Sequence, residues 1–383
     1  MFIELHLLQN FAPSNLNRDD TGSPKECEFG GYRRARISSQ CFKRAIRMGF
    51  PALLGKDELA TRSKLLVTQK LVPTLVERGR DAEQARAAIE SALGAVKLKL
   101  EDDAKTQYLL FLSSSEIAAL ADACDRNFDA LLKAAGEGGS NKRSKKEVRA
   151  EIPPEVRSAV ESILDGGKAA DLALFGRMIA NLPEKNIDAA AQVAHAISTN
   201  RVSPEFDYFT AVDDLNPKEK TGAGMIGTVE FNSACFYRYS NVDLAQLAAN
   251  LKGDTELAHR TLDSFIRSTI EAVPSGKQNS MAAHNPPSFV MAVVREAGLW
   301  SLANAFLDPV RPDDDGDLVR KDLVRKSIER IDQHWGALTK MYGTKGVVCA
   351  RFTALEGGKL QNLGAPLDNV DALVGSLMSA AKF

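Results

Sequence analysis

The 383-residue sequence has only five cysteines, and they are scattered along the chain rather than grouped. An odd number without regular spacing does not support a disulfide framework and is typical of free thiols in a reducing compartment. No apolar run approaches the roughly 18 residues that a membrane-spanning helix needs. Residues 1–11 contain no basic leader followed by a small-residue cleavage site. We therefore expect no secretory signal, a cytoplasmic location and no membrane partner.

Recognisable catalytic and cofactor motifs are also missing. The five histidines show no metal-ligand spacing with cysteine or carboxylate, and neither HExxH nor CxxC occurs. The pair Gly276-Lys277 looks like part of a phosphate-binding loop, but Glu271 stands where that loop needs its first glycine. We expect no catalytic residue, no metal and no other cofactor. Lys277 is then either a polar contact to a ligand or a plain turn residue.

Two pairs of carboxylates keep a nuclease function open as an alternative. Asp19-Asp20 and Asp213-Asp214 could each bind a divalent metal ion for phosphodiester cleavage. Such pairs more often cap helices or hold neighbouring arginines. On these residues alone, catalysis is the less favoured interpretation.

The charge is unevenly distributed in a chain whose net charge is only −1. Residues 33–47 contain six basic residues and no acid, whereas residues 308–317 are acidic. A further basic stretch, residues 141–149, is diluted by glutamate and flanked by glycines. A segregated basic segment can bind nucleic acid even where the average charge is close to zero.

Residue periodicity predicts an α+β fold. Alternation of apolar side chains predicts strands, and apolar residues at i, i+3, i+4 and i+7 predict helices. The predicted strands cover residues 2–8, 228–239, 288–296 and 346–357. Residues 11–37 are predicted to form a long loop, residues 51–196 a helical insertion with an exposed loop from Gly136, and residues 244–251 a helix.

The clearest functional pattern is a basic amphipathic helix, predicted from Ser38 or Ser39 to Gly49 with serine as the N-cap. Its polar side chains recur at helical spacing and form one stripe, which comprises Gln40, Lys43, Arg44 and Arg47. Phe42 and Ile46 fall on the opposite face and would anchor the helix in a core. Free N–H groups at the helix start, together with Gly30-Gly31, would let a phosphate chain approach closely. A solvated amphipathic helix is the alternative.

A polar, glycine-bearing segment over residues 202–227 is predicted to be an extended excursion with a turn at Asn216-Pro217. It carries Tyr208 and Phe209 beside Thr210. Aromatic side chains on an extended hairpin can stack on bases, each stack contributing about 1–3 kcal/mol. They can equally fold back onto a core, and the residues alone leave both possibilities open.

Six blocks of the sequence resemble the CasC-type backbone subunits of the type I-E CRISPR Cascade complex. The blocks are LNRDD (16–20), FGGYRRARISSQCFKRAIR (29–47), AHAISTN (194–200), DYFTAVDDL (207–215), GTVEFNSACFYRYSNVDLAQL (227–247) and NPPSFVM (285–291). They follow the order found in that family. The helical insertion and the tail after residue 308 match by position only.

The resemblance implies a right-hand architecture. Residues 1–50 and 228–383 would form a palm with an RNA-recognition-motif-like, ferredoxin-like sheet; residues 51–196 would form helical fingers and residues 197–227 a thumb hairpin. It also implies a non-catalytic role in antiviral defence, in which copies of the chain polymerise head to tail along a CRISPR RNA and present it for pairing with target DNA. The implied partners are the CRISPR RNA, target DNA, further copies of the chain and the other Cascade subunits.

Carried over position by position, the resemblance implies specific contacts. Arg18 and Lys25 would touch the guide, as would the polar stripe. Met178, within the tripeptide GRM, would pack around a displaced nucleotide together with Tyr208, Phe209 and Thr210; Tyr208 replaces a tryptophan expected in some relatives. Related RNA-targeting complexes cut their target with an acidic thumb residue, which here would be Asp213 or Asp214. A free-standing regulatory RNA binder is a third possibility.

Overall fold

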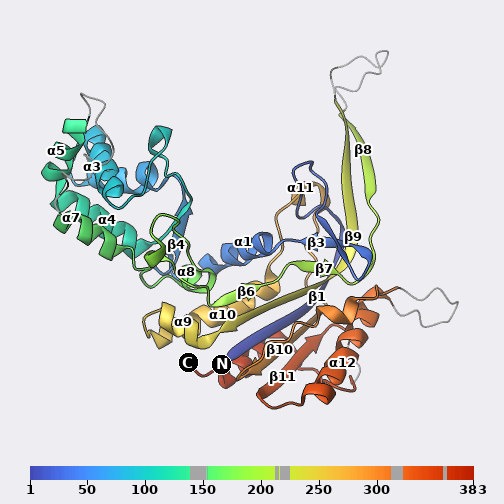
Figure 1. Ribbon diagram of the computed structural model, residues 1–383. Helices are drawn as coiled ribbons and strands as arrows, with labels where there is room; N and C mark the ends of the chain where they lie inside the picture. The colour runs from blue at the N-terminus through green and yellow to red at the C-terminus, as the bar shows by residue number, and fades with distance from the viewer. Residues whose placement is uncertain (139–151, 153, 212–214, 216–224, 312–321, 357–359) are drawn as a thin grey trace. The chain divides into compact units, whose positions relative to one another are not determined.

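The computed structural model describes residues 1–138, 152, 154–211, 215, 225–311, 322–356 and 360–383. The chain forms two compact units (Figure 1). The first unit comprises Met1–Phe50, Ala191–Leu244 and Leu262–Phe383, and the second comprises Pro51–Ala190 and Ala245–Thr261. The second unit thus stops short of residue 196, the predicted end of the helical insertion, and adds a segment that was assigned to the palm.

The first unit is built on an antiparallel sheet with the strand order β11-β10-β1-β9-β7-β3-β2. Its strands are β1 (Phe2–Ser14), β2 (Glu26–Phe29), β3 (Tyr32–Ile37), β7 (Ala196–Ser198), β9 (Met225–Asp243), β10 (Phe289–Arg295) and β11 (Val347–Ala354). Two further strands, β6 (Ala191–Val193) and β8 (Glu205–Ala211), pair with β9. The four strands predicted from alternation are all present, and the α+β class is confirmed.

Helices cover both faces of this sheet, which is why β10 and residues 3–8 of β1 are buried on both sides. One face carries Leu8, Tyr237 and Phe289, which pack against α12 (Leu323–Tyr342) and the short 3-10 helix η6 (Ala303–Phe306). The other face is covered by α1 (Ser39–Gly49) and the end of α10 (Thr255–Glu271). The helices α11 (Gln278–Met281) and α13 (Val370–Ala380) complete the described part of this unit.

The second unit is mainly helical, as predicted, but it also contains a two-stranded sheet. Its elements are η2 (Lys56–Glu58), β4 (Ala60–Ser63), a π-helical turn (Val67–Leu71), α2 (Val72–Glu77), α3 (Ala82–Ala95), η4 (Asp102–Ala104), β5 (Leu110–Ser113), α4 (Ser114–Arg126), α5 (Phe128–Gly138), α7 (Pro154–Ile163), α8 (Ala170–Phe175), η5 (Pro183–Lys185) and most of α9 (Leu244–Asn250), with η1 (Phe50–Ala52) leading into it. Ile89, Leu120 and Leu131 belong to its hydrophobic core. No helix of the described residues is long and apolar enough to cross a membrane.

The prediction of one long loop over residues 11–37 is wrong in part. Strand β1 continues to Ser14, and β2 and β3 form a hairpin. Gly30 and Gly31 make its two-residue turn with φ of 63° and 79°, a conformation that glycine adopts without steric cost. Short strands interrupted by glycine and charged residues show no clear alternation, so the sequence pattern concealed them. The predicted turn at Asn216-Pro217 and the basic stretch 141–149 lie outside the described residues.

The hairpin is held in the first unit by a fully buried arginine. Arg34 on β3 donates hydrogen bonds to the carbonyl oxygens of Ser198 and Thr199 at 2.8 and 3.0 Å, and to that of Phe306 at 2.6 Å. A buried cation is tolerated only where hydrogen bonds replace its hydration. Arg34 therefore joins β3 to the ends of β7 and η6.

We predict that Arg34→Met lowers the free energy of unfolding by at least about 3 kcal/mol, because it leaves several buried carbonyl oxygens without donors. Denaturant titration followed by circular dichroism measures the change. The matched control is Arg33→Ala on the same strand. This variant loses an exposed ion pair with Glu26, and we expect the free energy of unfolding to change by less than about 1 kcal/mol. Equal destabilisation by the two variants would contradict the structural role of Arg34.

Candidate nucleic-acid interface

The basic helix is present as predicted, with apolar residues on one face and polar residues on the other. Ser38 caps α1 by accepting a hydrogen bond from the Cys41 N–H. Phe42 and Ile46 are buried against the sheet. Of the polar stripe, Gln40 and Arg44 are exposed, whereas Lys43 and Arg47 are half-buried. Partial burial lowers the pKa of Lys43 from its ordinary value.

The six basic residues between 33 and 47 do not all lie on one surface. Arg33 pairs with Glu26, Arg34 is buried, and Arg36 bonds within the unit. Gly30 approaches a backbone closely, but that backbone belongs to the same chain: a Cβ there would lie 2.0 Å from the Leu307 carbonyl oxygen. The glycine pair therefore serves the hairpin turn, and the remaining cations of this segment, Lys43, Arg44 and Arg47, lie on α1.

The loop between β1 and β2 is held by its own hydrogen bonds, although its sequence reads as irregular. The Asp19 carboxylate accepts from the N–H groups of Thr21 and Ser23 and from the Thr21 hydroxyl, and these bonds lower the pKa of Asp19. Buried Asn15 donates to the carbonyl oxygens of Gly22 and Glu230 at 3.0 and 2.8 Å. These bonds hold the loop against strand β9, and the side chain of Arg18, which the loop carries, is exposed.

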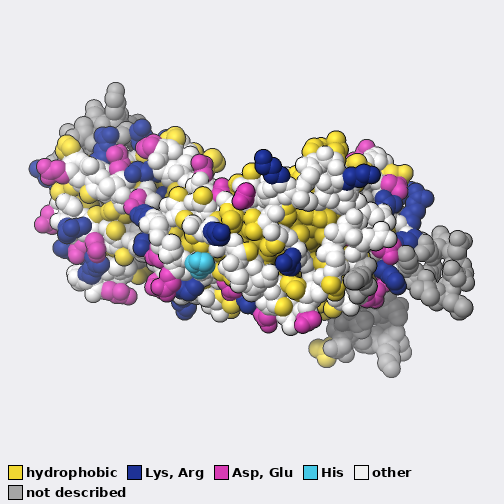
Figure 2. Space-filling model, turned by 90° about the horizontal axis from the view of Figure 1, so that it is seen from below, with side chains coloured by type: hydrophobic (Ala, Val, Ile, Leu, Met, Phe, Trp, Pro, Cys, Tyr) yellow, Lys and Arg dark blue, Asp and Glu magenta, His cyan; other side chains and the backbone are white. Residues whose placement is uncertain are grey.

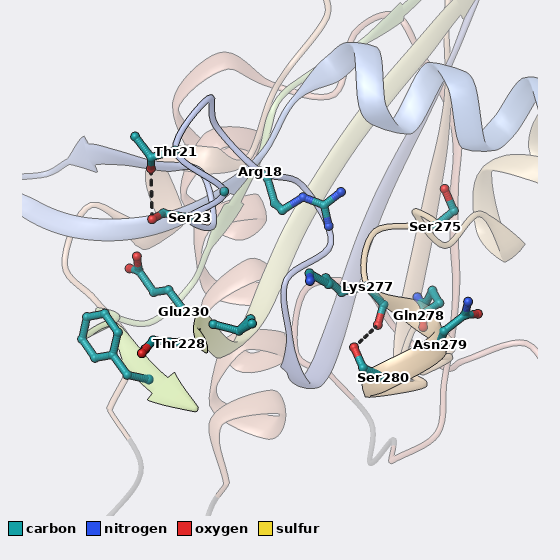
Figure 3. Close-up of a pocket in the computed structure, with 13 residues that line it drawn as sticks. Arg18, Thr21, Ser23, Thr228, Glu230, Ser275, Lys277, Gln278, Asn279 and Ser280 are labelled. Atoms are coloured by element: carbon teal, nitrogen blue, oxygen red, sulfur yellow. Dashed lines mark hydrogen bonds between the residues drawn. The ribbon is translucent and has the colours of Figure 1, made fainter. Parts of the chain in front are cut away.

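A pocket of about 940 Å³ lies in the first unit between this loop, the base of the β8–β9 hairpin and the α11 segment. Arg18 and Lys277, both proposed from sequence, line it together. Figure 3 shows Arg18 between the loop and β9 residues on one side, namely Thr21, Ser23, Thr228 and Glu230, and Ser275 to Ser280 on the other. Two cations on a polar wall that also bears an aromatic ring form a surface suited to a phosphate and a base.

Lys277 owes its place in the pocket to the glycine before it. A Cβ at Gly276 would lie 2.3 Å from the Leu16 carbonyl oxygen, so only glycine allows the α11 segment to lie this close to the loop. Lys277 itself adopts a left-handed conformation with φ of 52°. Gln278 donates to the carbonyl oxygens of Pro274 and Ala283 and has a structural role.

The aromatic residues of β8 lie on a two-stranded ribbon that β8 forms with β9 (Figure 1). All seven residues of β8 are exposed. Because side chains alternate along a strand, Tyr208 and Phe209 point to opposite faces. The Phe209 ring covers Gly227 on the paired strand, whereas Tyr208 shares its face with Phe206 and Thr210. Phe206, 66% exposed and part of the pocket wall, was missed from sequence although its i, i+2 spacing to Tyr208 signals it.

Met178 lies in the second unit with 80% of its surface exposed. Its position is set by Arg177, which is buried and donates to the Glu116 carboxylate at 2.8 Å and to the carbonyl oxygen of Leu164. Gly176 has a φ of 73° and no room for a Cβ beside the Ile187 carbonyl oxygen. The tripeptide GRM therefore combines a tight turn, a buried anchor and an exposed apolar side chain.

Only one of the two predicted carboxylate pairs lies within the described residues. The Asp19 carboxylate accepts hydrogen bonds from its own loop, whereas Asp213 and Asp214 lie outside the described residues. Among the described residues, no group of three or more His, Cys, Asp or Glu side chains is placed to hold a metal ion. On the face in Figure 2, basic and acidic side chains are interspersed, in keeping with the low net charge. Binding roles of the eleven candidate residues stay predictions.

Comparison with known proteins gives matches along almost the whole chain. The model of a family described as CT1975-like protein matches residues 3–375. A chain of a "CRISPR RNA-guided surveillance complex, pre-nicking" is similar at 32% identity with a TM-score of 0.86, and a chain of a "CRISPR RNA-guided surveillance complex" at 27% identity with a TM-score of 0.76. In both comparisons 100% of each chain is covered. No curated protein matches.

We predict that Gly276→Ala displaces the α11 segment and opens the pocket, because the new methyl group collides with a backbone carbonyl rather than with a flexible side chain. Overpacking of this kind costs about 1–3 kcal/mol. Hydrogen exchange should increase at residues 15–25 and 275–281 and remain unchanged elsewhere in the first unit. Ser275→Ala, a change at the exposed neighbouring residue, is the matched control and should leave exchange at the wild-type level; identical exchange in both variants would argue against the close approach.

Proposed function

Because the chain belongs to the CT1975-like protein family, we propose that it is a non-catalytic, CRISPR RNA-binding backbone subunit of a type I-E Cascade complex. The observation that carries the proposal is the full-length similarity to chains of two CRISPR RNA-guided surveillance complexes. Copies of the chain would assemble head to tail along the guide and present its bases to target DNA. Head-to-tail contacts that do not close into a ring produce an open helix, the geometry needed to follow a strand.

The topology supports a ferredoxin-like palm within the first unit. In chain order, β1, α1, β7, β9, α10 and β10 reproduce a βαββαβ sequence of elements. In space these strands follow the order β10-β1-β9-β7, with every neighbouring pair antiparallel. In this interpretation the second unit corresponds to the fingers and the β8–β9 ribbon to the thumb.

The charges on α1 support a sequence-independent mode of RNA binding. Lys43, Arg44 and Arg47 present cations on the side of the helix opposite its buried apolar residues. Contacts of this type reach phosphate oxygens and carry no base information, so the edges of the guide bases remain free to pair with a target. The exposed rings of Phe206 and Tyr208 offer a surface on which a base can stack.

Co-expression with the partner subunits and a CRISPR array tests the function directly. We predict that RNA of one uniform length co-purifies with several copies of the protein. A nucleic-acid-free monomer would contradict the backbone role, and a discrete complex without a filament would favour the regulatory alternative. Metal-dependent cleavage of a paired target, abolished by Asp213→Ala or Asp214→Ala, would overturn the non-catalytic assignment.

We further predict that Lys43→Ala combined with Arg47→Ala weakens RNA binding for all sequences alike. Each lost phosphate contact should lower the slope of log affinity against log salt concentration by about 0.7. Fluorescence anisotropy with two unrelated single-stranded RNAs at several salt concentrations gives the slope. Lys340→Ala, which removes an exposed cation from the last turn of α12, is the control; a double variant whose slope equals that of this control would exclude α1 from the RNA-binding surface.

A further inference from the structure

A second group of basic side chains lies at the N-terminal end of α1, outside the polar stripe. Arg36 is the penultimate residue of β3, Lys25 precedes β2, and His195 stands between β6 and β7. The Arg36 N–H donates to the Lys25 carbonyl oxygen at 2.8 Å, which places these two residues side by side. The Arg36 guanidinium lies 2.9 Å from Nδ1 of His195. The β2–β3 hairpin and the segment between β6 and β7, which are far apart in the sequence, thus meet at this point.

The hydrogen bond between Arg36 and His195 determines how the imidazole is oriented. A guanidinium has only donors, so Nδ1 must accept and the proton of the neutral ring resides on Nε2. His195 is exposed, and no hydrogen bond joins its Nε2 to another of the described residues. The ring therefore carries an N–H donor that an external acceptor can reach.

The charges around this imidazole are mainly positive. Partial burial, followed by the charges of Arg36 and Lys25, lowers the pKa of His195 from its ordinary value. The nearby acid on β2, Glu26, forms an ion pair with Arg33. The backbone carbonyl oxygen of Glu26 accepts a hydrogen bond from Arg36 Nε. Asn17 links the cluster to α1. Its carbonyl oxygen accepts from the Lys25 N–H at 2.9 Å, and its side-chain oxygen accepts from the N–H of Ser38, the N-cap of α1, at 2.8 Å.

We propose that Lys25, Arg36 and His195 together bind one phosphodiester group of the RNA backbone beside the first turn of α1. The proposal rests on the function proposed above and adds Arg36 and His195 to the residues that serve it. A guanidinium and an ammonium supply charge, and the imidazole supplies a directed N–H. The positive end of the α1 dipole favours an anion at the same position.

Binding at this site should be linked to protonation of His195. In the free protein two cations oppose a charge on the ring, and protonation would also remove the acceptor that Arg36 uses. A bound phosphodiester offsets that repulsion, so the pKa of His195 is higher in the complex than in the free protein. RNA affinity should consequently rise as the pH falls through the pKa of the complex and level off below the pKa of the free protein. The gain is up to about tenfold for each unit between the two values.

The test uses the full-length protein and a synthetic single-stranded RNA, with affinity measured by fluorescence anisotropy between about pH 5.5 and 8. His195→Gln retains a neutral donor but cannot titrate, so its affinity should stay close to wild type at the alkaline end while its pH dependence is lost. His334→Gln is the matched control, because partial burial also lowers the pKa of His334 but it lies on α12. This control should keep the wild-type profile.

Two further measurements make the result independent of folding defects. Arg36→Gln should weaken binding at every pH and lower the salt slope by about 0.7, with an unchanged unfolding midpoint. The imidazole resonances of His195 in the wild-type protein should titrate at a higher pH when RNA is present.

A wild-type pH profile in His195→Gln together with a wild-type salt slope in Arg36→Gln overturns the site but leaves the proposed function intact, provided that the α1 double variant still weakens binding. A wild-type protein that binds no RNA at any pH overturns both.

Discussion

The placement of α1 on the sheet depends on one buried guanidinium, that of Arg238 on β9. It lies 4.2 Å from the centre of the Phe42 ring and donates to the Gln9 side-chain oxygen at 2.6 Å and to the Thr269 carbonyl oxygen at 2.5 Å. Burial lowers the pKa of Arg238 to about 9, so it still carries its charge at neutral pH. Because Arg238 contacts β1, α1 and α10 at once, the basic helix and the start of its polar stripe take their position from the centre of the sheet.

Arginine serves two opposite purposes in this protein, and only the surroundings distinguish them. Arg34 and Arg177 are buried and satisfy carbonyl and carboxylate oxygens, and Arg295 forms an ion pair with Glu4 at 2.6 Å in the core of the sheet unit. Arg18 and Arg44 are exposed and available to a ligand. Removing a buried member leaves its partners unsatisfied, whereas removing an exposed one changes the surface charge. A count of basic residues therefore overstates the binding surface, as it does for residues 33–47.

The ribbon shows how a projecting element can be positioned without a core of its own. A two-stranded ribbon is marginally stable by itself. Here one of its strands, β9, is a single 19-residue strand that continues into the sheet, where it pairs with β1. The buried half of β9 fixes the direction of the exposed half. The aromatic rings of β8 and the pocket at the base of the ribbon are therefore carried by a strand that is anchored in the sheet.

The sequence by itself determined four of the strands (β1, β9, β10 and β11), the limits and polarity of α1, the helical character of the second unit and the family, because these depend on local periodicity, capping and short motifs. It also pointed to Arg18 and Lys277 as polar contacts. Only the tertiary structure decided that these two share one pocket, that Phe206 belongs to its wall, that Gly30 meets Leu307, and that Arg36 meets His195. Such pairs are brought together by the way the chain packs around the sheet, and a local pattern of residues does not indicate which distant residues it will contact.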